Sequence, residues 1–413
     1  MDPLRNPFAP GAGTQPPELA GRKDEIDQVD LLMRRVESGR PEKSLLITGL
    51  RGVGKTVLLN RFRDAAEEHG WAVDLREMKG PKDHQQPFRE VMADMCRKTL
   101  LSLGRDQQIA DLARRALGVL RSFRLTGSAS DTGSVELSLG VEPVLGVGDS
   151  GQLDIDLGDL FIELGKVARA RHTGVMLLLD EVQNLRQPDL AALIGALHQV
   201  DQRRLPVTAI AAGLPTLPVL AAEAKSYAER LFDFRVIGQL TDEATRVAFT
   251  GADADVEWST GALDRLVIET DRYPHFIQEW GKQTWLAAAA SRVTSMDVVH
   301  AHDAVMRALD IGFFKLRADR ATDRERDYLT AMAGFGRGPY KSGEVARAMG
   351  GKPESVGMFR DNLRRKGIIY APDHGLVDFT VPHFDEYMRR TGGRDGRVMG
   401  DRHPTDPETP TAI

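Results

Sequence analysis

The residues whose types and spacing point most directly to chemistry lie in one glycine-rich segment. Its members are Gly49, Leu50, Arg51, Gly52, Val53, Gly54, Lys55 and Thr56, with Val57 directly after it. The segment fits the pattern G-x-x-x-x-G-K-[ST], in which glycines let main-chain N–H groups converge on phosphate oxygens. Lys55 is placed to reach the β- and γ-phosphates, and the Thr56 hydroxyl can hold Mg²⁺. The pattern therefore predicts that the protein binds ATP or ADP, together with Mg²⁺.

The flanks of this segment argue against the alternative interpretation, a plain glycine-rich turn. An apolar run at residues 45–47 has the length of a buried strand and comes directly before the segment. An apolar helical pattern follows it and ends near Gly70. A helix that begins at the loop adds the partial positive charge of its N-terminus to the phosphate site. Strand, glycine loop and helix together predict a phosphate-binding site.

Two acidic residues, Asp180 and Glu181, follow a second apolar strand pattern at residues 175–179. The end of a buried parallel strand lies at the carboxyl edge of the sheet, where ligands bind in open α/β folds. Asp180 has the oxygen ligands that Mg²⁺ prefers, and Glu181 could orient or deprotonate the attacking water. The structural alternative is a solvated acidic turn, which the upstream phosphate loop disfavours. Gln183 and Asn184 are near enough in sequence to join this group, but their side-chain directions cannot be inferred.

The elements that must position these residues are expected to alternate between strands and helices. Buried apolar strands separated by helices predict a parallel sheet covered on both faces. We therefore expect an α/β P-loop NTPase core at residues 18–240. Its further strands are expected at 71–75 and 207–212, and its helices at 24–38, 86–103, 107–123 and 157–171.

Residues 124–156 interrupt this pattern and predict a β-hairpin insertion. The prediction rests on apolar residues that alternate with polar or small ones between glycine-rich turns. These apolar residues are Val135, Leu137, Leu139, Val141, Leu153 and Ile155.

After the core, the sequence predicts a helical lid at residues 241–321 and a winged helix-turn-helix at residues 322–391. The last block shows three helical patterns and then two short alternating runs around a Pro-Asp-His-Gly turn. Winged helices bind DNA or dock on proteins, so both kinds of partner stay open. The net charge from residue 321 to 392 is +2, from 12 basic minus 10 acidic residues. That charge is small for a DNA-binding surface.

The second helix of such a motif would contact the major groove, and it is expected at residues 354–366. Asn362 is placed to read bases, because an asparagine amide can pair bidentately with adenine. Arg364 and Arg365 lie on the flanks, where they would contact phosphates. Lys366 is expected to face outward with Asn362.

The ends and the composition of the chain limit the remaining possibilities. Residues 1–17 contain five prolines and predict a flexible lead-in, and residues 392–413 predict a disordered tail. The single cysteine, Cys96, excludes an internal disulfide and fits a reducing compartment. No run of eighteen apolar residues exists, so no membrane contact is expected. We expect a cytoplasmic protein.

An opening segment ahead of the phosphate loop, Leu19-Ala20-Gly21-Arg22-Lys23-Asp24-Glu25, has the form L-x-G-R-x-x-E. With the loop and the Asp180-Glu181 strand, the chain resembles the origin-recognition-type AAA+ ATPases and the neighbouring STAND signalling ATPases over residues 19–281. The resemblance implies that Leu19, Gly21 and Arg22 help to cover the adenine. It also implies that Pro274, in Tyr273-Pro274-His275-Phe276, packs on the base.

The same resemblance implies an arginine finger at Arg230, with Arg235 as the second candidate. A guanidinium of this kind spreads charge off the γ-phosphate and normally comes from a neighbouring subunit, which implies a nucleotide-dependent homo-oligomer. An ion pair of Arg230 with Glu229 or Asp233, or action within its own subunit, is the alternative. Two departures from the family's pattern predict slow turnover. The strand at residues 207–212 is followed by no polar residue, and Arg272 is the only arginine near the lid motif.

Three functions are compatible with these residues. The first is a Mg²⁺-dependent ATPase whose nucleotide state controls a DNA-binding winged helix. The second is a STAND-like slow switch that gates contact with a protein partner. The third is a transcription factor in which the nucleotide is only structural. Turnover separates the first from the second, and salt-dependent DNA binding separates the first and third from the second.

Overall fold

The computed structural model describes residues 1–79, 87–103, 109–127 and 141–392. The chain folds as two compact units, one covering Met1–His302 and a second that begins at Asp303. The first unit contains the phosphate loop, the sheet and most of the expected lid. The boundary lies inside helix α12 (Ser295–Leu309), ahead of the border expected at residue 322.

The first unit is built on a parallel sheet of five strands in the order β2-β3-β4-β1-β5. The strands are β1 (Ser44–Thr48), β2 (Ala72–Glu77), β3 (Val175–Asp180), β4 (Val207–Gly213) and β5 (Phe232–Val236). Every residue of β1, β3 and β4 is buried, because helices cover both faces of the inner strands. The predicted α/β fold class is confirmed.

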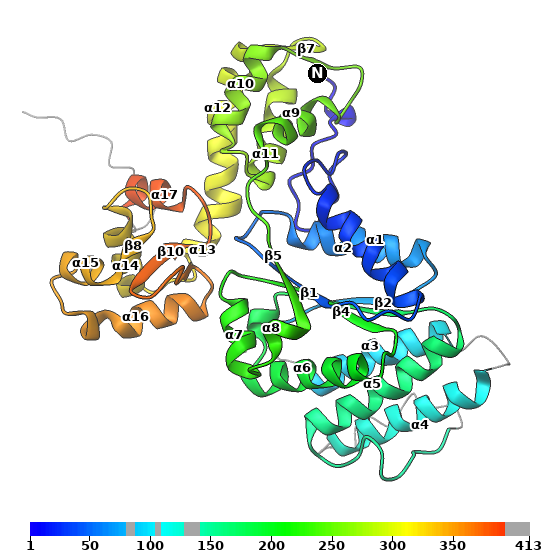
Figure 1. Cartoon of the computed structure of the whole chain (residues 1–413). Helices are drawn as coiled ribbons and strands as arrows, with labels where there is room; N and C mark the ends of the chain where they lie inside the picture. Colours follow the sequence, from blue (N-terminus) through cyan, green and yellow to red (C-terminus); the bar gives the residue numbers. More distant parts are fainter. Residues whose placement is uncertain (80–86, 104–108, 128–140, 393–413) are drawn as a thin grey trace, which may run out of the picture. The chain divides into compact units, whose positions relative to one another are not determined.

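Helices lie on both faces of this sheet (Figure 1). On one face, α1 (Lys23–Glu37) packs on α2 (Lys55–Glu68), which contacts β2, β3 and β4. On the other face, α5 (Leu153–Ala170) and α6 (Gln187–Gln202) pack against each other and against β4. The helix after the phosphate loop is therefore clamped between the sheet and α1, and this packing holds the loop in place.

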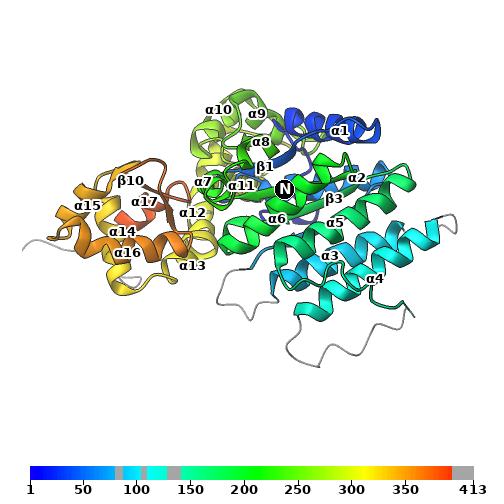
Figure 2. The same cartoon turned by 60° about the horizontal axis from the view of Figure 1, so that its bottom comes forward.

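Two further helices, α3 (Phe88–Leu103) and α4 (Ala110–Gly127), extend this second layer and lie beside α5 in Figure 2. The predicted strand residues Leu153 and Ile155 were assigned wrongly, because they lie in the first turn of α5. Leu153 packs against the main core, whereas Ile155 is 43% exposed, and one short amphipathic turn can mimic strand alternation. The expected strand around Val135, Leu137 and Leu139 lies outside the described residues.

The predicted lid is mainly helical. It contains α9 (Asp242–Thr250), α10 (Thr260–Glu269), α11 (Pro274–Ala287) and the first part of α12. A short parallel pair, β6 (Glu257–Trp258) with β7 (Arg292–Val293), joins the two halves of this region. Thr241 and Ser259 cap α9 and α10 through their side-chain oxygens, which explains where these helices begin.

The N-terminal segment is packed, so the flexible lead-in predicted for residues 1–17 is wrong in the described structure. Phe8 is 3% exposed and its ring lies 5.8 Å from Phe249 and 5.9 Å from Trp258. A Cβ at Gly281 would lie 2.4 Å from the Phe8 ring, so only glycine lets α11 approach it. Prolines here reduce the freedom of an extended segment that has apolar surface to bury.

The second unit contains the predicted order of three helices and two antiparallel strands. These are α14 (Asp323–Ala333), α15 (Ser342–Ala348), α16 (Pro353–Arg365), β9 (Ile369–Tyr370) and β10 (Leu376–Phe379). A third strand, β8 (Tyr340–Lys341), gives the sheet order β8-β10-β9. The predicted tail at residues 392–413 lies almost wholly outside the described residues.

Two helical elements close this unit at its ends, which explains why it begins before residue 322. η4 (Asp310–Lys315) and α17 (Phe384–Thr391) are brought together by Phe314, whose ring stacks on Tyr387 at 5.5 Å. Arg390 adds an ion pair to Asp310. Among the helices of the described ranges, none is long and apolar enough to cross a bilayer.

Candidate functional site

The predicted phosphate loop connects the carboxyl end of β1 to the first residue of α2. Gly52 and Gly54 have φ angles of 86° and 95°, in the left-handed region that favours glycine. Gly49 is constrained as well, because a Cβ there would lie 2.4 Å from the main-chain oxygen of Ile237. α2 begins at Lys55, so its unpaired N–H groups face the loop. The loop has the main-chain form that a phosphate site needs.

The side chain of Lys55 is bonded to the main chain of this loop. Its side chain is buried, and Nζ donates to the main-chain oxygens of Gly49 at 2.8 Å and Leu50 at 2.9 Å. Burial lowers the pKa of Lys55 to about 8, although the charges of Glu181 and Asp180 act in the opposite direction. A buried ammonium with only carbonyl partners is costly, and a phosphate anion would relieve that cost.

Thr56 and Asp180 come together across the loop and the end of β3. Thr56 Oγ1 donates to Asp180 Oδ2 at 2.5 Å. Asp180 is 5% exposed, and burial raises its pKa although Thr56 and the Glu181 N–H donate to it. A hydroxyl and a carboxylate are hard oxygen donors of the kind that Mg²⁺ prefers. These two residues would hold the ion, and its charge would offset that of the bound phosphates.

Glu181 follows directly in a left-handed turn, with φ of 53°. Its Oε1 lies 3.5 Å from Arg51 Nη1, and its Oε2 accepts a hydrogen bond from Gln183 Nε2. The side chain is 19% exposed, so water can reach the carboxylate. The predicted metal ligand and the predicted base therefore lie side by side, with different surroundings.

Sequence reasoning missed the roles of three nearby side chains. Gln183 Oε1 accepts from the N–H of Leu214, whereas Asn184 Nδ2 donates to the main-chain oxygen of Met78 at 2.8 Å. Glu77 ends β2 opposite Asp180, and burial, followed by the charges of Asp180 and Glu181, raises its pKa. The sequence signal for Glu77 was an acidic residue just after the strand expected at residues 71–75.

The opening segment contacts both the loop and the lid. Arg22 is buried, and its Nη2 donates to the main-chain oxygens of Val53 at 3.1 Å and Gly238 at 2.5 Å. Burial lowers the pKa of Arg22. Gly21 has φ of 67°, and a Cβ there would lie 2.8 Å from the Cβ of Ala244 in α9. Leu19 precedes these residues and is half-buried, and the Arg22 bond to Val53 places the segment beside the loop.

The start of α11 contacts the same loop from the lid. Tyr273 Oη donates to the main-chain oxygen of Arg51 at 2.5 Å, and the N–H of His275 donates to that of Gly52 at 3.1 Å. Pro274 lies between these two residues as the first residue of the helix. The lid motif is thereby held against the phosphate loop. Arg272, the only candidate there for a second sensor, lies 3.3 Å from Asp242.

Arg230 lies at the opposite edge of the sheet from its own phosphate loop. It lies in α8 (Ala228–Leu231), just before β5, whose first residue, Phe232, pairs with Ser44 at the amino end of β1. A five-residue strand spans about 16 Å, which separates Arg230 from the loop beyond Thr48. Its side chain is exposed and forms no ion pair with any described residue, whereas Arg235 pairs with Asp233 at 3.0 Å. The geometry argues against action within the same subunit.

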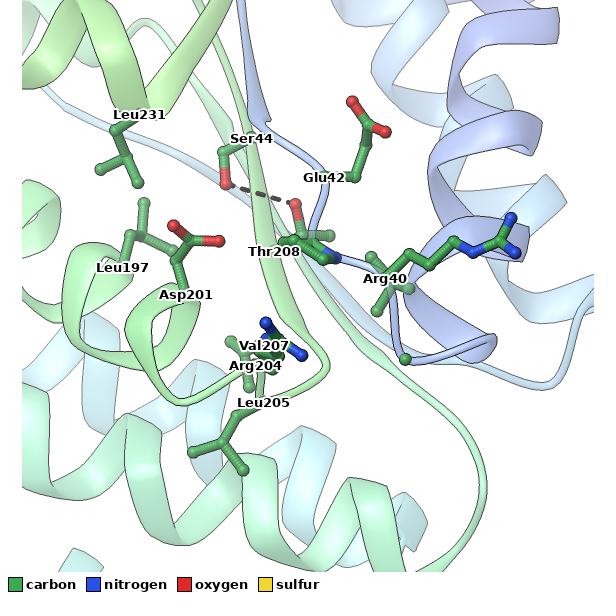
Figure 3. Close-up of a pocket in the computed structure, with 13 residues that line it drawn as sticks. Arg40, Glu42, Ser44, Leu197, Asp201, Arg204, Leu205, Val207, Thr208 and Leu231 are labelled. Atoms are coloured by element: carbon green, nitrogen blue, oxygen red, sulfur yellow. Dashed lines mark hydrogen bonds between the residues drawn. The ribbon is translucent and has the colours of Figure 1, made fainter.

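A small pocket also opens at this amino edge, between the starts of β1 and β4 (Figure 3). Ser44 Oγ and Thr208 Oγ1 lie 3.2 Å apart in it, and Asp201 and Arg204 approach from the end of α6. Its volume of about 30 Å³ has room for one or two water molecules. The predicted nucleotide residues do not line it, so it is separate from the site above.

In the second unit, α16 carries the predicted DNA contacts. Arg364 and Arg365 are exposed, and Arg365 donates to the side chain of Asn362, which is half-buried. The prediction for Lys366 was wrong, because its Nζ bonds to Glu325 at the start of α14. That contact secures α16 to α14, so it removes one positive charge from the exposed face.

Comparisons with known proteins agree with this architecture. Residues 18–210 match a family model described as an AAA ATPase domain, and residues 311–388 match a domain of unknown function. Comparison with curated protein sequences found no match.

Solved structures add a comparison of the whole chain. The ORC2 protein of Aeropyrum pernix, solved as ADPNP and ADP complexes, is 15% identical, with a TM-score of 0.53 and coverage of 92% of this chain and 96% of that one. Cdc6p of Pyrobaculum aerophilum is 15% identical, with a TM-score of 0.44 and coverage of 94% and 96%. At 15% identity, the likeness to the Aeropyrum pernix protein concerns the fold alone. Residues 18–210 therefore match an AAA ATPase domain model, and the chain is similar in fold to the ORC2 protein of Aeropyrum pernix.

Proposed function

We propose that the first unit binds ATP with Mg²⁺ and hydrolyses it. One observation carries the proposal. The ends of β1 and β3 bring Lys55, Thr56, Asp180 and Glu181 to the same edge of the sheet, with Thr56 Oγ1 and Asp180 Oδ2 only 2.5 Å apart. Such a set has a phosphate cradle, a metal pair and a water-accessible carboxylate, which together are the parts that phosphoryl transfer to water needs.

Each group has a distinct role in this proposal. The N–H groups of the loop and the Lys55 ammonium bind the β- and γ-phosphate oxygens. Thr56 and Asp180 hold Mg²⁺, which supplies positive charge to the phosphates when it is bound. Glu181 orients a water molecule and holds the proton that this water loses as phosphate is released. Arg22, Tyr273 and Pro274 close the site from the opening segment and the lid.

Glu181→Gln provides the direct test. We expect ATP affinity to stay within about threefold of wild type, while steady-state phosphate release falls by roughly 10²–10⁴-fold. Asp180→Asn should instead raise the Mg²⁺ concentration needed for half-maximal turnover. Glu67→Gln, an exposed residue of α2, is the matched control and should change neither quantity. A wild-type rate in Glu181→Gln would assign the base to another residue, and a wild-type protein that does not bind ATP would end the proposal.

We further propose that the nucleotide state controls contact of the second unit with duplex DNA. The observation behind this step is the pair of exposed cations Arg364 and Arg365 at the end of α16, beside Asn362. Phosphate contacts by two arginines would contribute most of the affinity, and an amide would contribute sequence preference. Exchange of ATP for ADP should change the affinity by about 1–3 kcal/mol, the usual range for linked sites.

Fluorescence anisotropy on random duplex DNA at two salt concentrations tests this step. The double variant Arg364→Ala/Arg365→Ala should weaken binding about equally on all sequences and flatten the salt dependence. Arg320→Ala/Arg324→Ala removes two exposed arginines elsewhere in the same unit and serves as the control. An absence of DNA binding at low salt, with ATP or ADP present, would replace this step with contact to a protein partner.

A slow, STAND-like switch is the second candidate for the whole molecule. β4 ends at Gly213 without a polar side chain, and Arg272 is engaged with Asp242. Both features support slow hydrolysis, which suits a protein that holds its nucleotide and gates a partner. Comparing single-turnover hydrolysis with nucleotide release separates the two candidates, because a switch keeps its bound nucleotide through many minutes of incubation.

A further inference from the structure

The side chain of Gln183 connects the proposed base to the strand that borders the phosphate loop. Gln183 lies in η3 (Val182–Asn184), the short turn directly after β3. Its Oε1 accepts the N–H of Leu214 at 3.0 Å, and its Nε2 donates to Glu181 Oε2. The Leu214 bond assigns the orientation of the amide, because only an oxygen can accept from a main-chain N–H. The Nε2 group must therefore face the carboxylate.

The amide of Gln183 also occupies the space beside Gly213, the last residue of β4. A Cβ at Gly213 would lie 2.6 Å from Gln183 Oε1 and 2.8 Å from Leu217 Cδ2. The main-chain oxygen of Gly213 accepts from the N–H of Gly49 at 3.2 Å, so this strand end touches the phosphate loop. A glycine in β4 thus makes room for a polar group that comes from another element.

We propose that Gln183 is a positioning residue that holds the Glu181 carboxylate in the orientation used for hydrolysis. This inference deepens the proposed function and rests on it. Arg51 lies 3.5 Å from one carboxylate oxygen, and Gln183 binds the other, so the two side chains hold the carboxylate from both oxygens. Without the amide, the attraction of Arg51 is unopposed and draws the carboxylate toward the loop. Displacements of about 1 Å at a reacting group cost up to about 10²-fold in rate.

Gln183→Ala tests the inference, because a positioning role should lower kcat and leave KM nearly unchanged. We expect kcat to fall by about 10–100-fold while KM for ATP stays within about threefold, because the amide touches the carboxylate and not the loop. Asn184→Ala is the matched control: it removes the neighbouring amide of the same turn, which bonds to Met78 and not to Glu181. Its kcat should stay within about threefold of wild type.

A second pair of variants uses the close approach at Gly213. Gly213→Asn alone should lower kcat, because the new side chain displaces the Gln183 amide. The double variant Gln183→Ala/Gly213→Asn moves an amide onto β4 and should recover at least part of the activity that Gln183→Ala loses. A role in local stability alone predicts the opposite order, with the double variant the least active.

Affinity for Mg²⁺-ADP with aluminium fluoride, relative to Mg²⁺-ADP alone, provides a readout that needs no turnover. The preference for the fluoride complex should fall in Gln183→Ala and stay unchanged in Asn184→Ala. A wild-type kcat and preference in Gln183→Ala would overturn the inference, and so would an equal loss in Asn184→Ala. Failure of the proposed function is a different result, since wild-type protein itself would then bind no ATP or release no phosphate.

Discussion

At the scale of single residues, the buried charge of Lys55 lowers the stability of the free protein and favours phosphate binding. Nζ has two carbonyl partners and no anion within hydrogen-bond distance among the described residues. Burial accordingly lowers the pKa of Lys55 to about 8, below that of a free lysine. A polyphosphate would supply the missing negative charge. The charge that binds phosphate therefore makes the nucleotide-free protein less stable.

Lys55→Ala should separate these two effects. We expect ATP affinity to fall by at least about 100-fold, which corresponds to roughly 3 kcal/mol. The stability of the nucleotide-free protein should not fall, because the variant removes a charge whose burial opposes folding. Lys43→Ala removes an exposed lysine just before β1 and should change neither property. Titration of a fluorescent ATP analogue and thermal unfolding are the measurements, and equal affinity in a folded variant would contradict the assignment of the loop.

At the scale of elements, the N-terminal segment connects two helices of the first unit that are distant in sequence. The N-terminal segment runs from the lid to the helix after the phosphate loop. The Met1 ammonium donates to Trp285 and Ala288 main-chain oxygens, and the main-chain oxygen of Gly13 accepts from Asn60 Nδ2 at 3.2 Å. Asn60 belongs to α2, so one segment secures lid helix α11 and the helix that begins at Lys55.

Phe8→Ala should weaken this attachment. Removing a fully buried phenylalanine ring costs about 3–5 kcal/mol of stability. Leu4→Ala is the matched control, because Leu4 is 96% exposed and should cost little. Hydrogen exchange should then increase in α9 and α11, the helices next to the Phe8 ring. Unchanged exchange in these helices would show that the lid does not depend on the segment.

The pair of Glu325 and Lys366 gives the second unit a pH dependence. Burial alone would raise the pKa of Glu325, but the hydrogen bonds from Lys366 and the Thr322 N–H outweigh it, and the pKa is lowered. A carboxylate with a lowered pKa stabilises the folded state above its unfolded pKa, and this stability is lost as the pH falls through the folded pKa. Glu325 also completes a capping box with Thr322 at the start of α14.

Glu325→Gln should therefore destabilise the second unit at neutral pH by about 1–2 kcal/mol, the usual cost of a lost helix cap. The difference from wild type should shrink as the pH falls below the ordinary carboxyl range. Glu354→Gln, an exposed glutamate in the first turn of α16, is the control. Urea unfolding followed at several pH values measures the effect, and a pH-independent difference would assign it to packing.

At the scale of the whole molecule, Arg230 lies away from the phosphate loop of its own subunit. An exposed arginine at the amino edge of the sheet cannot reach a γ-phosphate at the carboxyl edge of the same sheet. A neighbouring copy of the chain could place it there. Hydrolysis would then depend on assembly, and the nucleotide would sit between subunits.

Mixing two inactive variants tests this arrangement. Lys55→Ala retains Arg230 but loses its nucleotide, and Arg230→Ala retains its nucleotide but loses the finger. Each alone should hydrolyse ATP at least about 100-fold more slowly than wild type, and the mixture should recover activity. Arg203→Ala is the control, because Arg203 is an exposed arginine at the C-terminal end of α6. Specific activity that is independent of concentration, in a protein that stays monomeric, would rule out a finger from a neighbour.

Several properties of this protein were determined by the sequence alone, because short stretches of chain decide them. The phosphate loop depends on glycine conformations and on Lys55 and Thr56 at fixed positions, and these are local. The inner strands contain unbroken apolar runs, because both of their faces are buried. This pattern is the same whichever helices cover the sheet. Asp180 and Glu181 had to lie at the carboxyl edge once that strand was identified. Local geometry and full burial leave few alternatives at these positions.

Tertiary structure alone decided the direction of each side chain that contacts a distant element. Gln183 points to Glu181 and Leu214 while its neighbour Asn184 points away, and spacing does not distinguish the two. Phe8 is buried only because an aromatic pair and Gly281 form its pocket some 240 or more residues later. Lys366 faces Glu325 because α14 packs on α16. In each case the deciding partner is remote along the chain, so the contact exists only after the chain has folded.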